Sequence, residues 1–128
     1  MIPLIKHADL TIDIMVFDWR LYPNDLGSPV QLFTNAVLQA VKRGVIVRAI
    51  VNYPEVAKLL TANGAKAKIL NDKALLHTKM VCVDRQALVV GSHNFTARAF
   101  SFNHEMSVLI HDEYLASQAG EYFNQLWQ

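Results

Sequence analysis

The chain has 128 residues, of which 52% are hydrophobic and 18% are charged, so it has enough apolar material for the core of a single domain spanning residues 1–128. The net charge of +1 is too close to zero to argue for nucleic acid or an anionic membrane as a partner on charge alone. The single cysteine, Cys82, excludes an intramolecular disulfide framework.

The N-terminal residues 1–7 lack a basic segment followed by a long apolar one, so no signal peptide is visible and a cytoplasmic location is favoured. No apolar run reaches the roughly 18 residues that a membrane-spanning helix requires, and we expect no stable membrane insertion.

The first half of the chain predicts strands that alternate with helices. Ser28 and Pro29 are typical of the N-cap and first turn of a helix, and the near-continuous apolar run 45–51 is typical of a buried parallel strand. The expected elements are a strand at 10–19, a helix from 28 to Gly44, a strand at 45–51, a helix from Pro54 to Asn63-Gly64 and a short strand near 66–70.

The second half predicts three further strands and one helix. The strands are expected at 75–83, 87–92 and 104–110, and Asp112 is expected to cap the last helix. A β-α-β-α-β opening followed by an antiparallel portion predicts the α/β class, with a mixed β-sheet flanked by helices on both faces.

Two short patterns stand out in this second half. His77, Lys79 and Asp84 form the pattern H-x-K-x(4)-D, and Gly91-Ser92-His93-Asn94 follows close behind. A random chain of this length shows the first pattern with a probability of about a few per cent, and adding G-S-x-N lowers the coincidence below roughly one in a thousand. The two patterns therefore predict a functional site.

The spacing of these residues fits phosphate binding. Side chains alternate along a strand, so His77 and Lys79 are expected on one face about 6.5 to 7 Å apart, where they can hold one phosphate. Ser92 and Asn94 supply donors for its oxygens. Glu105 lies in a mostly apolar run and needs a partner, for which an imidazole is the natural choice. Asp84 has the opposite parity at the strand end, which favours a structural role there.

The set of motifs resembles the signature of the phospholipase D superfamily, the HKD phosphodiesterases. The resemblance implies a phospholipase D-like single-repeat fold and a two-step displacement that needs no metal or cofactor. It implies that His77 is nucleophile or acid/base, that Lys79, Ser92 and Asn94 bind the phosphate oxygens, and that Glu105 orients the histidine. Asp84 completes the motif and so counts among the candidate catalytic residues.

The mechanism of this superfamily uses two histidines, while the chain has one HKD motif. The resemblance therefore implies a homodimer in which two copies share one site. The alternative is that the chain is half of a two-motif protein. Nucleic acid is the leading substrate class, which predicts a nuclease, because the small chain leaves little room for a lipid pocket. A lipid phosphodiesterase or phosphatidyl transferase and a non-catalytic phosphate-binding module are the alternatives. A zinc site from His77, His93, His104 and His111 lacks the spacing of known zinc patterns.

Overall fold

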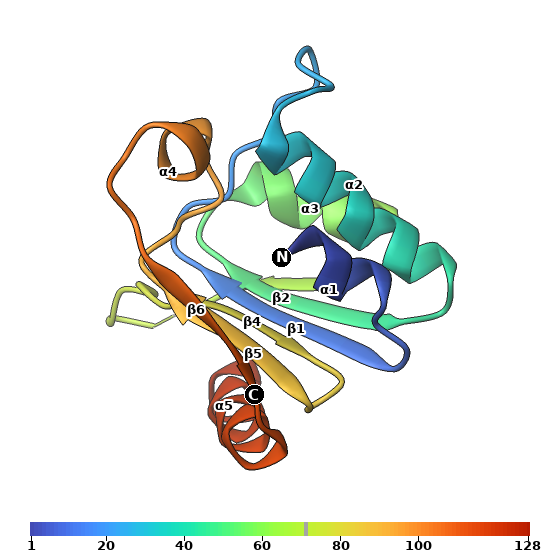
Figure 1. Ribbon diagram of the computed structural model, residues 1–128, viewed down its shortest axis with the longest axis vertical. Helices are drawn as coiled ribbons and strands as arrows, with labels where there is room; N and C mark the ends of the chain where they lie inside the picture. Colours follow the sequence, from blue (N-terminus) through green and yellow to red (C-terminus); the bar gives the residue numbers. More distant parts are fainter. Residues whose placement is uncertain (71) are drawn as a thin grey trace.

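Figure 1 shows the computed structural model, which describes residues 1–70 and 72–128 and has helices on both sides of one sheet. Asn71, between the strands expected near 66–70 and at 75–83, lies outside the described residues. The helices are α1 (Ile2–Lys6), α2 (Pro29–Lys42), α3 (Pro54–Ala62), α4 (Ala97–Ser101) and α5 (Glu113–Trp127). The strands are β1 (Thr11–Val16), β2 (Ile46–Val51), β3 (Lys66–Ile69), β4 (Lys79–Val83), β5 (Ala87–Gly91) and β6 (Ser107–His111).

The sheet is mixed, as predicted. Its strand order is β3-β2-β1-β4-β5-β6, with β1, β2 and β3 parallel to one another and β4, β5 and β6 joined by antiparallel pairing. The central strand β1 runs parallel to β2 and antiparallel to β4, and Val16 at its end pairs with Lys79 at the start of β4. The C-terminal ends of β1, β2 and β5 and the N-terminal ends of β4 and β6 therefore share one edge of the molecule.

The helices divide between the two faces of the sheet. Helices α1, α2 and α3 contribute to one buried cluster, and α5 covers the other face alone (Figure 1). None of the helices in the described part of the chain is long and apolar enough to cross a membrane.

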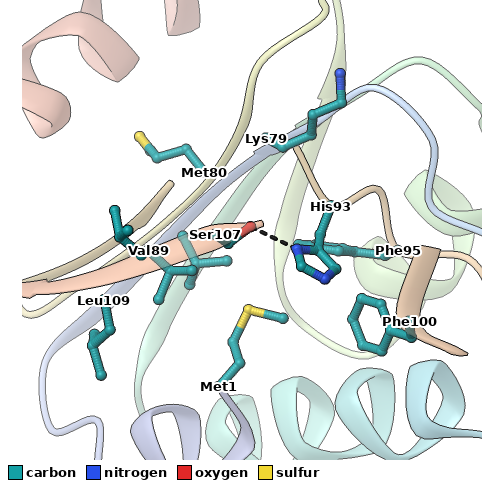
Figure 2. Close-up of a pocket in the computed structure, with 11 residues that line it drawn as sticks. Met1, Lys79, Met80, Val89, His93, Phe95, Phe100, Ser107 and Leu109 are labelled. Carbon is teal, nitrogen blue, oxygen red and sulfur yellow. Dashed lines mark hydrogen bonds between the residues drawn. The ribbon is translucent and has the colours of Figure 1, made fainter. Parts of the chain in front are cut away.

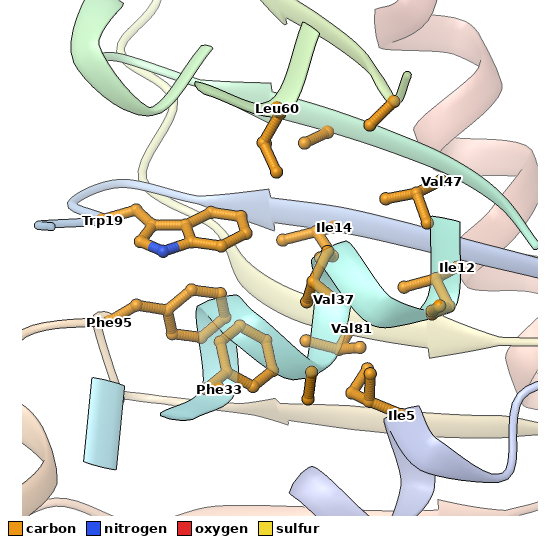
Figure 3. Packing of buried hydrophobic residues seen from close by; sticks show 14 of the residues in the cluster. Ile5, Ile12, Ile14, Trp19, Phe33, Val37, Val47, Leu60, Val81 and Phe95 are labelled. Carbon is orange, nitrogen blue, oxygen red and sulfur yellow. The ribbon is translucent and has the colours of Figure 1, made fainter. Parts of the chain in front are cut away.

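The larger cluster lies between α2 and the sheet and is built around aromatic side chains. Figure 3 shows Trp19, Phe33 and Phe95 packed together beside the aliphatic residues of β1 and α2. The ring of Phe95 lies 5.2 Å from that of Trp19 and 4.7 Å from that of Phe33. The indole nitrogen of Trp19 donates to Thr34 Oγ1 at 3.0 Å, which satisfies the one polar group that the indole buries.

The smaller cluster under α5 is held by a buried ion pair. Arg48 Nε and Nη2 donate to the two carboxylate oxygens of Asp13 at 2.8 and 2.9 Å, and Nη2 also donates to Asn124 in α5 at 3.0 Å. The Arg48 guanidinium lies 4.7 Å from the centre of the Phe123 ring. Arg48 thus joins the sheet to α5 through its ion pair with Asp13, its hydrogen bond to Asn124 and the packing of its planar guanidinium on Phe123.

Several predicted elements differ from the observed ones. Strand β4 begins at Lys79, so Leu75 and His77 precede it and do not share a strand face with Lys79. Residues 75–78 have no regular secondary structure, and of the two leucines Leu75 is 66% exposed while Leu76 is buried. The short helices α1 and α4 are not among the expected elements. Ser28 does occupy the N-cap of α2, but its hydroxyl makes no capping hydrogen bond.

Asp84 occupies a hairpin turn at the end of β4 and is not part of the predicted phosphate site. It follows Val83, about 16 Å along the strand from Lys79. Asp84 and Arg85 have φ values of 55° and 54°, which the turn between β4 and β5 requires. Its carboxylate accepts from the backbone N–H groups of Asp9, Leu10 and Thr11 at 2.9, 2.7 and 2.9 Å. The Asp84 carboxylate thus makes structural contacts outside the pocket, which favour a structural over a catalytic role.

These bonds make Asp84 a stabilising residue whose effect depends on pH. Partial burial raises the pKa of its carboxyl group, but the three backbone donors outweigh burial and hold the pKa below its ordinary value. A carboxyl group with a lowered pKa stabilises the fold above its unfolded-state pKa, and this stabilisation is lost as pH falls through the folded-state pKa.

We predict that Asp84→Asn lowers the free energy of unfolding by about 1 to 2 kcal/mol at neutral pH, because the amide offers one acceptor oxygen instead of two. Asparagine tolerates the left-handed backbone at this position, so the turn itself is kept. Urea denaturation at neutral and acid pH measures the effect, which should shrink as pH falls. The exposed Asp25→Asn is the matched control, and equal stability of the two variants at neutral pH would contradict the role of Asp84.

Candidate active site

An open pocket lies at the edge of the sheet where β1, β2 and β5 end. It brings together four of the residues that the motifs single out, His77, Lys79, Ser92 and Asn94. The other lining residues are Thr78, Val90 and Gly91. The pocket is built from the segment before β4, the start of β4 and the loop after β5, so it depends on the antiparallel pairing of β4 with β5.

His77 and Lys79 form the centre of the pocket. Lys79 Nζ lies 3.1 Å from Nδ1 and 3.2 Å from Nε2 of His77, and it donates to the His77 carbonyl oxygen at 2.8 Å. Burial lowers the pKa of Lys79, and the negative charge of Glu105 acts against this effect. An imidazole and a partly desolvated cation therefore face the same small volume, which suits an anionic ligand.

Ser92 and Glu105 are joined by a short hydrogen bond. Ser92 Oγ donates to Glu105 Oε1 at 2.5 Å, and Asn103 Nδ2 donates to Glu105 Oε2 at 3.2 Å. The Met106 N–H donates to Ser92 Oγ at 3.0 Å, which fixes the hydroxyl between two chain segments. The bonds from Ser92 and Asn103 lower the pKa of Glu105, so the group is a carboxylate at neutral pH.

These partners correct the predicted environment of Glu105. In the described residues its carboxylate is bonded to Ser92 and Asn103, and not to the imidazole of His77. Strand β6 begins at Ser107, so Glu105 precedes it. The predicted strand at 104–110 therefore starts later than expected and does not place Glu105 on a strand face. Glu105 instead acts on the pocket through Ser92 and through its charge on Lys79.

Asn94 is held by the segment that follows β1. Its Oδ1 accepts from the Asp18 N–H at 3.2 Å, and the Phe95 N–H donates to the Asp18 carbonyl at 2.8 Å. These two bonds continue the sheet beyond its regular strands, where Trp19 and Phe95 form a parallel bridge. Because Oδ1 is bonded to backbone, the NH₂ group of Asn94 is the part of the amide that can donate to a ligand.

Gly91 allows β5 and β6 to approach closely at the pocket. A Cβ atom at this position would lie 2.1 Å from Ser107 Oγ and 2.4 Å from the Met106 carbonyl oxygen. Any side chain there would push β6 away and separate Ser92 from Glu105.

Two residues of the site escaped sequence reasoning. The Phe17 ring packs against the His77 imidazole with centroids 5.1 Å apart, and Asn52 bonds the backbone beside it. Phe17 directly follows β1 and Asn52 directly follows β2. Ligand sites of open sheets lie at the carboxyl ends of parallel strands, and this position in the sequence could have identified both residues. Trp19, two residues after Phe17, is buried in the core.

The histidines do not gather into a metal site. Among residues 1–70 and 72–128, no three side chains of His, Cys, Asp or Glu are placed to hold a metal ion. His93 Nδ1 lies 2.7 Å from Ser107 Oγ, in a second cavity on the α1 face of the sheet.

The coupling of Glu105 to Lys79 gives a testable shift. Glu105→Gln removes the negative charge that favours the ammonium form, so the pKa of Lys79 should fall further below its ordinary value. NMR titration of the Lys79 side-chain methylene measures the midpoint. Glu113→Gln, at the start of α5, is the control. A midpoint that Glu105→Gln leaves at the wild-type value would show that the two groups are not coupled.

Comparison with known proteins identifies the family to which the chain belongs. The model of the family described as "Cardiolipin synthase, PLD-like domain" matches residues 1–127. A phospholipase D of Rickettsia felis is 33% identical over 102 residues, which are 75% of this chain and 51% of the relative. The mitochondrial cardiolipin hydrolase of the dog is 30% identical, with 98% of this chain and 47% of the relative covered. The chain thus spans about half the length of these relatives.

Solved structures share the fold. Nuc of Salmonella typhimurium, a phospholipase D family member, superposes with a TM-score of 0.84 at 23% identity, covering 98% of this chain and 83% of Nuc. NucT of Helicobacter pylori superposes with a TM-score of 0.76 at 18% identity, covering 98% and 84%. The family match over nearly the whole sequence, together with this fold, shows that the chain belongs to the phospholipase D superfamily, in the family of PLD-like domains named for cardiolipin synthase.

Proposed function

We propose that the chain is one catalytic unit, residues 1–128, of a phosphodiesterase that cleaves nucleic acid through a phosphohistidine at His77. The observation that supports this proposal most strongly is that His77, Lys79, Ser92 and Asn94 line the same pocket. A nucleophilic ring nitrogen, a cation and a neutral amide donor are groups that displacement at a phosphodiester requires, while Ser92 donates its one hydroxyl proton to Glu105.

In the proposed first step, a ring nitrogen of His77 attacks phosphorus and the bond from phosphorus to the leaving oxygen breaks. A general acid gives that oxygen its proton. In the second step, water attacks the phosphorus of the phosphohistidine and loses a proton to the former general acid. The nitrogen–phosphorus bond breaks, which frees the imidazole. Lys79 and the Asn94 amide stabilise the negative charge on the non-bridging oxygens, and Glu105 orients Ser92.

A second copy of the chain is the proposed source of the general acid. His77 is the one histidine among the described residues that lines the pocket, and the nucleophile and the general acid must be two different groups. Large apolar side chains near site residues in the sequence are highly exposed: Leu75 at 66%, Phe102 at 75% and Met106 at 78%. Burial of these side chains between two copies would bring their His77 residues together at a two-fold axis.

The open pocket supports nucleic acid as substrate, since the backbone of an extended polymer can reach phosphate groups at an exposed sheet edge. We propose it over lipid because five of the seven residues that line this pocket have polar side chains.

A second substrate class has its own observation. A second cavity of about 340 Å³ shares Lys79 with this pocket, and Figure 2 shows residues that line it. Its remaining lining is mostly apolar and includes Met1, Val89, Phe100 and Leu109. Such a cavity suits an acyl chain, which makes a glycerophospholipid the second candidate.

A substrate panel tests the function. We expect cleavage of single- or double-stranded DNA or RNA in excess EDTA, because His77 and Lys79 supply the nucleophile and the charge that a metal would otherwise provide. His77→Ala should lower the rate at least about a thousandfold. Cleavage of phosphatidylcholine vesicles without cleavage of nucleic acid would establish the second candidate, and loss of activity on chelation would contradict the mechanism.

Mixing of chains tests the shared site. Wild-type protein is exchanged with an about ninefold excess of His77→Ala chains, so most wild-type chains enter mixed dimers with one intact histidine. Activity per wild-type chain should then fall to about a tenth. An equal excess of His104→Ala, altered at an exposed histidine outside the pocket, is the control. Unchanged activity with His77→Ala would mean that each chain works alone.

A further inference from the structure

His77 is not held by the sheet. Strand β4 begins at Lys79, and the last pair between β1 and β4 joins Val16 to Lys79. His77 lies two residues before this point, on a segment without regular secondary structure, and its side chain is exposed. A nucleophile needs a fixed approach to phosphorus, so some other contact must hold this segment in place.

Asn52 supplies that contact. It follows β2 directly, and its Nδ2 donates to the Phe17 carbonyl oxygen at 2.9 Å and to the Leu76 carbonyl oxygen at 3.0 Å. One amide group thus uses its two N–H bonds to join the end of β1 to the peptide that precedes His77. The half-buried side chain makes these bonds in a place where water competes less for the carbonyl groups.

Phe17 contacts the side chains of His77 and Lys79. Its ring centroid lies 5.1 Å from that of His77, with the ring planes tilted by 47°. Lys79 Nζ lies 5.6 Å from the Phe17 ring centroid, within the range of a cation–π contact. The two bonds of Asn52 therefore fix both the backbone beside His77 and the residue that the imidazole packs against.

We propose that Asn52 is a positioning residue of the active site, which orients the His77 imidazole through the Leu76 peptide and the Phe17 ring. The expected effect of Asn52 on catalysis rests on the proposed function. Its expected effect on the orientation of His77 rests on geometry alone. Asparagine suits the position because it is neutral and has two donors. Aspartate would present only acceptor oxygens to two carbonyl groups, and leucine would leave both carbonyl groups without this donor.

The fold should tolerate loss of these bonds. The Leu76 side chain is buried in the cluster with Met15, Ile50 and Met80, and this packing keeps the segment on the sheet, whereas Asn52 fixes the orientation of the peptide before His77. Removing the amide should therefore free the orientation of His77 without unfolding the protein.

The kinetic test compares Asn52→Leu with Asn63→Leu. Asn63 also donates from its amide to a carbonyl, that of Leu59, but at the end of α3 away from the pocket. We expect Asn52→Leu to lower kcat about 10- to 100-fold with KM changed less than about threefold, since phosphate binding by Lys79 and Asn94 remains. Asn63→Leu should change neither. Equal loss in kcat for the two variants, or a rise in KM with kcat unchanged, would overturn the proposal.

A second readout does not depend on activity. In protein labelled at histidine, the His77 ring signals should be single in wild type and broadened or doubled in Asn52→Leu, with the signals of the exposed His7 unchanged. Phe17→Leu, which keeps both Asn52 bonds because they end on the backbone, should also broaden His77. Sharp, single His77 signals in both variants would refute the positioning role. Wild-type protein without phosphodiesterase activity would refute the proposed function and leave this test intact.

Discussion

The position of the candidate active-site pocket beside the ends of β1 and β2 depends on the pairing of β1 with one parallel and one antiparallel neighbour. Because β1 runs parallel to β2 and antiparallel to β4, the end of β1, the end of β2 and the start of β4 meet at one edge of the sheet. Phe17, Asn52 and Lys79 lie at these three points. The hairpin from β4 to β5 then returns the chain to the same edge and delivers Ser92 and Asn94. Without the change of direction at β1, both motifs would lie at the end of the sheet opposite Phe17 and Asn52.

Interactions far from the pocket hold this pairing in place. Asp84 joins the turn between β4 and β5 to the segment that leads into β1, at the end of the sheet opposite the pocket. Arg48 and Asp13 hold β2 and β1 together beneath α5. The HKD motif therefore combines two physical roles, since its histidine and lysine form the site while its aspartate secures the hairpin that carries them.

Much of this arrangement could be predicted from the sequence. Apolar runs and helix-start residues such as Pro29 identify the alternating elements, because burial and backbone geometry impose them locally. The grouping of His77, Lys79, Ser92 and Asn94 follows from the motif spacing across one hairpin.

The remaining features depend on contacts between distant segments. Leu75 and Leu76 look like a continuation of β4, yet only Leu76 finds a buried place. The partner of Glu105 is decided by how the loop from Ser92 to Met106 closes, and strand parity carries no information about this closure. Asn52 is distant in sequence from both motifs, and only the parallel pairing of β1 with β2 brings it beside His77.

The central claim is that His77 attacks phosphorus, and the covalent intermediate tests it most directly. A nitrogen–phosphorus bond survives alkali, so a reaction stopped with base within the first turnover and analysed by mass spectrometry of peptides should preserve the adduct. The account predicts the substrate's phosphoryl group on the peptide that contains His77, and its loss in His77→Ala. Turnover with the adduct on another residue, or hydrolysis by His77→Ala at the wild-type rate, would contradict it.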